Sequence, residues 1–100
     1  RDTKTAVNEI SLIGEFTQKA PMRYTPAGLA VLEGVFHHQG EVMEAGAKRK
    51  LMFDFPAIAI GEIAMALDKE PLGKALQVTG FIAPRSARSR QLIVHITQYS

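Results

Sequence analysis

The sequence of 100 residues contains no cysteine and no tryptophan. Without cysteine, the chain forms no disulfide, offers no thiolate to a metal ion and supports no thiol catalysis. It has no apolar run near the roughly 18 residues of a membrane-spanning helix, and no secretory signal opens it. The hydrophobic fraction of 46% favours a folded chain. We therefore predict one domain over residues 1–100, cytoplasmic and without membrane contact, with residues 1–6 as a flexible N-terminal segment.

Acidic residues are absent from residues 71–100, although the chain has 10 of them. The 12 Lys and Arg residues are also unevenly distributed, because half of them lie in two short acid-free segments. A surface without a partner usually intersperses both signs of charge. The segregation therefore points to a polyanion as the partner. The two segments hold Lys48, Arg49 and Lys50, and then Arg85, Arg88 and Arg90.

Apolar and polar residues alternate with the period of two of a half-buried β-strand in five segments. These are residues 9–16, 31–36, 48–55, 76–82 and 92–99.

The segments between these strands differ in character. Residues 37–47 and 83–90 are polar and glycine- or proline-containing, which is typical of loops. Residues 58–67 have the Ala, Leu and Met content of a short apolar helix. Pro56 is expected to end the third strand, because proline supplies no N–H to a ladder.

The predicted order is three strands, one helix and two strands. Gly14, Gly34 and Gly80 fall on the inner strand faces, where a small barrel needs tight bends or close backbone approach. The predicted fold is therefore all-β: a five-stranded Greek-key OB-fold barrel with one short helix between strands three and four.

Three motifs resemble the bacterial single-stranded-DNA-binding OB-fold family. They are N-x-[IV]-x-L-x-G from Asn8 to Gly14, R-Y-T-P-x-G ending at Gly28, and G-x-x-[LV]-x-[VI]-x-G from Gly73 to Gly80. Residues 20–23 and the FPAIAIG run are similar to the primosomal branch of this family, which acts in replication restart. As in that branch, we expect no Gly- and Pro-rich linker or acidic tip after the last strand.

The resemblance implies a homodimer that binds single-stranded DNA and joins a primosomal helicase, with other primosome proteins, at replication forks in the nucleoid. It also implies that the protein stimulates unwinding, is not an enzyme, and needs no cofactor or small-molecule substrate. Ile13, on the outer face of an edge strand, is compatible with pairing across a two-fold axis.

The missing tryptophan is a departure from the family, whose third strand often carries one for base stacking. Met52 takes that outward position. A thioether orients a base less well than an aromatic ring, whose stacking contributes about 1–3 kcal/mol per base. We therefore expect electrostatics to carry more of the affinity.

Most candidate DNA-binding residues lie on the strand 2–3 face and in the two loops that OB-folds commonly use, and Phe81 lies on the outer face of the fourth strand. The set is Lys19, Arg23, Tyr24, Lys48, Arg49, Lys50, Met52, Phe81, Arg85, Arg88 and Arg90.

Each candidate has an alternative role in the fold. The cations of residues 48–50 would equally protect a solvated strand edge from aggregation, and the arginines of residues 83–90 would equally form a hydrophilic loop tip. Tyr24 either stacks a base or caps the barrel end. Phe81 either stacks a base or lies under the helix or in a dimer contact.

The three histidines are not expected to form a metal site, because adjacent histidines such as His37 and His38 would point to opposite faces of a strand, and no carboxylate pair shares their spacing. No phosphate loop or catalytic triad is present. Two hypotheses remain open: a single-strand binder, and a protein-interaction module that docks on a helicase with incidental DNA contact.

Overall fold

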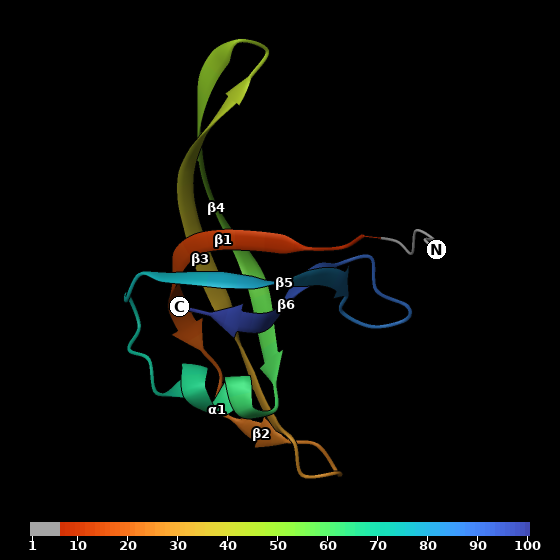
Figure 1. The fold of residues 1–100 in the computed structure, drawn as a ribbon. Coiled ribbons are helices and arrows are strands. Elements are labelled where there is room, and N and C mark those ends of the chain that lie inside the picture. Colours follow the sequence, from red (N-terminus) through yellow and green to blue (C-terminus); the bar gives the residue numbers. More distant parts are fainter. Residues whose placement is uncertain (1–6) are drawn as a thin grey trace, which may run out of the picture.

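The computed structural model describes residues 7–100, so the segment 1–6, predicted to be flexible, lies outside the described residues. This part of the chain forms six strands and one helix, whose arrangement can be followed in Figure 1. They are β1 (Ile10–Lys19), β2 (Arg23–Tyr24), β3 (Ala30–Glu44), β4 (Ala47–Ile60), α1 (Glu62–Asp68), β5 (Leu76–Pro84) and β6 (Leu92–Tyr99).

The five long strands close into a barrel in the order β1-β5-β6-β4-β3, and β1 then pairs with β3. The strand β1 pairs with two neighbours along its length, because residues 10–14 pair with β5 and residues 14–19 pair with β3. The β4–β6 pairing is parallel, and the others are antiparallel. The predicted five-stranded OB barrel with one short helix is confirmed.

The core fills the barrel interior from every long strand. Phe36 is fully buried and meets Phe16 edge-to-face at a centroid distance of 5.2 Å, the arrangement that aromatic quadrupoles favour. The helix α1 closes one end of the barrel with Ala64 and Leu67 (Figure 1). The alternation predicted for β1, β3 and β5 therefore places the expected residues inside.

Close backbone approach at three glycines is confirmed. A Cβ at Gly80 would lie 1.7 Å from the His95 carbonyl oxygen, and one at Gly14 would lie 2.0 Å from that of His37. At Gly34 the nearest atom, the Gln18 carbonyl oxygen, would be 2.4 Å away. Because any side chain would clash with the backbone of the neighbouring strand, each of these three positions requires glycine.

The prediction of a loop over residues 37–47 is wrong. The β3–β4 pairing continues to Glu44 opposite Ala47, and only Ala45 and Gly46 turn, with φ of 52° and 80°. Two positive φ values are those of a type I′ turn, whose twist matches that of the strands it joins. Residues 39–52, where β3 and β4 pair only with each other, project from the barrel as a two-stranded arm (Figure 1).

The expected strand end at Pro56 is also wrong, because β4 continues to Ile60 and α1 begins only at Glu62. Pro56 is tolerated because β6 joins β4 only at Ala57 and Ile58, so the proline lies at the margin of that ladder. The first connector likewise contains β2, which adds two residues to the edge of β3. Within residues 7–100, no helix combines the length and apolar character needed to cross a membrane.

Candidate nucleic-acid interface

The arm presents two faces that continue those of the barrel. Directly opposed residues of an antiparallel pair point to the same side, and successive residues alternate. The outer face of the arm therefore carries the predicted residues Lys48, Lys50 and Met52. Its complete set, from the pairs 39/52, 41/50 and 43/48, is Gln39, Glu41, Met43, Lys48, Lys50 and Met52.

Lys48, Arg49 and Lys50 do not form one patch. Arg49 lies opposite Val42, on the arm face that continues the barrel interior. Its Nη1 donates to Glu44 Oε1 at 2.6 Å, so its charge already has a partner. For Lys48 and Lys50, no ion pair is found within the described residues. These two lysines are the better placed cations.

A second group of cations meets on the outer face of the barrel at Glu33. Arg85 Nη1 donates to Glu33 Oε1 at 2.9 Å, and Arg23 Nη2 donates to Glu33 Oε2 at 2.5 Å. These hydrogen bonds, first from Arg85 and then from Arg23, hold the pKa of the Glu33 carboxyl below its usual value against the opposing effect of burial. Two predicted site residues, far apart in the sequence, are thus brought together by an acid that the sequence analysis did not select.

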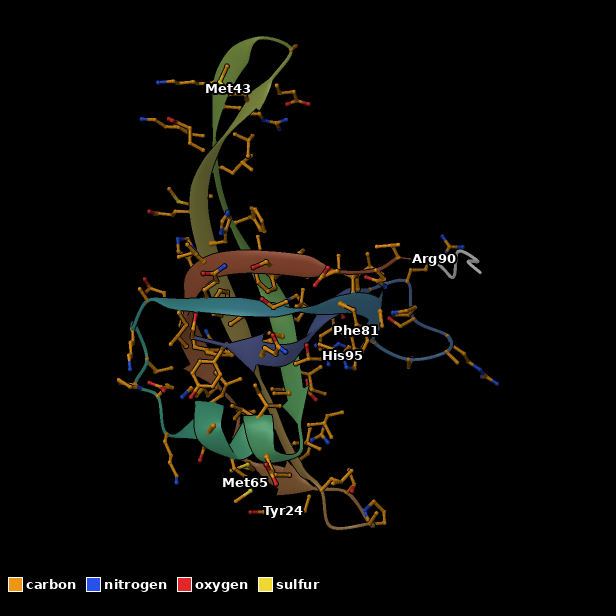
Figure 2. All side chains as sticks on the ribbon, viewed as in Figure 1. Tyr24, Met43, Met65, Phe81, Arg90 and His95 are labelled. Carbon is orange, nitrogen blue, oxygen red and sulfur yellow. The ribbon has the colours of Figure 1, made fainter. Side chains whose placement is uncertain are left out.

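The remaining loop candidates are exposed. Arg88 and Arg90 lie in the β5–β6 loop. Tyr24 is 64% exposed at the helix end of the barrel. Figure 2 shows Met43 near the arm tip, Arg90 at the far end of β5 and Tyr24 near α1, so the candidates span the length of the molecule.

Lys19 is engaged within the fold. Its Nζ donates to the carbonyl oxygens of Leu67 at 2.8 Å and Glu70, and it lies 5.7 Å from the ring centre of Phe16. The last turn of α1 has no basic residue of its own. The Lys19 cation therefore satisfies free carbonyls at the negative end of the helix.

Phe81 points away from the core on the outer face of β5, as predicted. Its ring is stacked on His95 at 4.7 Å and 9° (Figure 2). His95 pairs with Ile58 of β4, which lies opposite Glu33, so the stacked pair lies on the barrel beside the Glu33 group and not on the arm with Lys48 and Lys50.

Two apolar residues near the candidate cations were missed. Met43 is 65% exposed on the outer face of the arm, and the loop prediction concealed its alignment with Lys48. Phe53 was assigned to the interior by alternation, yet it is 42% exposed because the arm leaves the barrel there. Its ring contacts His38 at 5.1 Å. Among residues 7–100, no group of His, Asp and Glu side chains has the geometry of a metal site.

A closed OB barrel with a projecting arm and basic side chains on its outer surface defines the class of single-strand-binding OB-folds. The model of the family described as "Another single-strand binding protein family" matches residues 8–98. Two curated relatives are named replication restart protein PriB. The one from Nitrosomonas europaea is 39% identical over 89 residues, which are 89% of this chain and 82% of the relative. The one from Bordetella pertussis is 38% identical over 92% of this chain and 86% of the relative. The chain belongs to the family of PriB replication restart proteins.

Solved structures agree with this assignment. A PriB structure from Ralstonia solanacearum has a TM-score of 0.86 and 32% identity, covering 95% of this chain and 97% of that one. The single-stranded DNA binding protein from Thermus aquaticus has a TM-score of 0.71 and 25% identity, over 94% of this chain and 49% of that one.

Proposed function

We propose that this protein binds single-stranded DNA during replication restart, without enzymatic activity of its own. The observation that carries the proposal is the outer face of β3 and β4. It holds Lys48 and Lys50 on the arm, and the arginines of β2 and the β5–β6 loop flank it. This is the side on which OB-folds use strand faces and adjoining loops to hold oligonucleotides.

The chemistry of the face fits a backbone-directed, sequence-tolerant binder. Its cations suit phosphates, whereas Met43 and Met52 offer apolar contact to any base. Neutralising about four to six phosphates of a single strand gives a log–log salt slope of roughly −3 to −4.

The test is fluorescence anisotropy of a labelled oligo-dT titrated with the protein at low and at physiological salt. Salt-dependent binding that weakens on charge reversal at Lys48 and Lys50 supports the proposal. No binding at low salt rejects it in favour of the protein-interaction module. The acids Glu33, Glu41 and Asp54 on the same face are the feature that favours this second candidate.

The finer part of the proposal is that the protein acts as a homodimer, joins a primosomal helicase at cytoplasmic, nucleoid-associated forks and stimulates its unwinding. Residues 10–13 of β1 have only β5 as a neighbour within the described chain, and Ile13 is 57% exposed there. An unpaired edge with an exposed apolar side chain suits strand pairing with a second copy.

Sedimentation of the wild-type protein and of Ile13→Lys tests the dimer. A helicase unwinding assay with and without the protein tests stimulation.

A further inference from the structure

Glu33 stands out on the outer face because two arginines from different elements hold its two oxygens separately. Arg23 comes from β2 and Arg85 follows directly after β5, and they contact Oε2 and Oε1 respectively. All three side chains are accessible, with 58%, 39% and 25% exposed for Arg23, Arg85 and Glu33. Exposed ion pairs add little to stability, so folding alone explains this arrangement poorly.

The carboxylate has the chemistry of a phosphodiester. Both groups present two anionic oxygens, and guanidinium groups bind either through charge-assisted hydrogen bonds. Replacing the Glu33 carboxylate by a backbone phosphate would therefore keep a partner for each arginine.

The surroundings leave room for such a ligand. A groove of about 300 Å³ lies beside the Arg85–Glu33 pair, at the lower end of the range for ligand sites. Val35 and Pro56, which are directly paired, contribute apolar surface to it, and Gln18 contributes an amide.

We infer that Arg23 and Arg85 form a phosphate-binding site for single-stranded DNA, and that Glu33 occupies this site in the free protein and competes with the strand for it. The inference rests on the proposed function and adds a specific site to it. In this arrangement Glu33 lowers the affinity for DNA, because its carboxylate binds both arginines until a phosphate replaces it.

The experiment measures oligo-dT affinity by anisotropy for the wild type, Glu33→Gln and Glu41→Gln. Glu41 lies on the same outer face opposite Lys50, so its variant removes the same charge without freeing an arginine. Releasing two exposed ion pairs should tighten binding by Glu33→Gln about 3- to 10-fold beyond the change seen in Glu41→Gln. Arg85→Ala should cost more affinity in the Glu33→Gln background than in the wild type, because only there is Arg85 free from the start.

Equal affinities of Glu33→Gln and Glu41→Gln would overturn the site, and weaker binding by Glu33→Gln would show that Glu33 positions the arginines instead. If Glu33→Gln fails to fold, Glu33→Asp, which keeps the charge but shortens the reach to the arginines, is compared with Glu41→Asp as its matched control. A wild-type protein that does not bind oligo-dT rejects the proposed function and this site together. A wild-type protein that binds normally, with no gain in Glu33→Gln, rejects this site alone.

Discussion

The sharpest test of the interface compares variants of Lys48 and Lys50 with a variant of Arg49, which lies between them in the sequence. Lys48 and Lys50 project from the outer face, whereas Arg49 projects from the opposite face and is paired with Glu44 at 2.6 Å. The double variant Lys48→Gln/Lys50→Gln should therefore lose DNA affinity, and Arg49→Gln should not. If the three cations acted as one patch, each would contribute equally, and Arg49→Gln would also lose affinity.

The magnitude follows from counterion release. Each phosphate of a single strand that a cation neutralises contributes about 0.7 to the salt slope, so losing two contacts flattens it by about 1.4. If binding at 1 M salt is unchanged, the same loss weakens binding at 0.1 M salt by a factor of about 25. Exposed substitutions of this kind usually shift stability by no more than about 0.5 kcal/mol.

The assay is anisotropy of labelled oligo-dT over a series of salt concentrations, with thermal unfolding of each variant as the control for folding. An Arg49→Gln variant that flattens the slope as much as the double variant would refute the assignment of faces. A double variant with the wild-type slope would show that the strand does not run along the arm.

Three further predictions concern the fold and its charges. Gly80→Ala forces a methyl group onto the His95 carbonyl, 1.7 Å away, and should cost at least about 1–3 kcal/mol in urea unfolding. Gly40→Ala meets only the His38 ring, at 2.9 Å, and should cost much less. Lys19→Met removes the cation from the end of α1 and should cost up to about 2 kcal/mol in urea unfolding. Because the folded-state pKa of Glu33 is lowered by Arg85 and Arg23, its stabilising effect is complete above its ordinary value of 4.5 and is lost as the pH falls through the lower folded value. The stability difference between wild type and Glu33→Gln should therefore shrink in acid unfolding curves, and a constant difference down to pH 2 would contradict the ion-pair geometry.

The strand faces were predictable because side-chain alternation reports burial locally. Phe16, Phe36 and Val78 are core residues, as the pattern indicates. Gly14 and Gly80 stand at positions where the alternation calls for an apolar side chain. A glycine at such a position indicates that the backbone of another strand lies close to it.

The arm was not predictable from the same signal because both of its faces are exposed. Residues 41–50 have no buried side, so alternation between core and solvent does not apply, and their glycines and acids resemble a loop. What holds this segment in a ladder is cross-strand pairing within the hairpin, such as Glu41 opposite Lys50, and the Glu44–Arg49 ion pair. A sequence window shows opposite charges but not which ones become cross-strand partners.

The Glu33 contacts show the same limit for the site. Arg85 is 52 positions from Glu33 in the sequence, and only closure of the barrel brings the two within 2.9 Å. Both cations were candidates because they lie in the loops that OB-folds commonly use, whereas no sequence pattern pointed to Glu33.

The absence of tryptophan leaves the outer face of the arm without an aromatic ring. The outer face of the arm offers two methionines and no aromatic ring, and Phe53 lies on the other face against His38. Aromatic stacking worth about 1–3 kcal/mol per base is therefore missing from this face. The same outer surface also carries Glu33, Glu41 and Asp54, of which Asp54 is paired with His37 at 2.5 Å. With weak stacking and opposing acids, the net attraction for a strand depends on a few cations, so changes at single charges should alter affinity more than changes at Met43 or Met52.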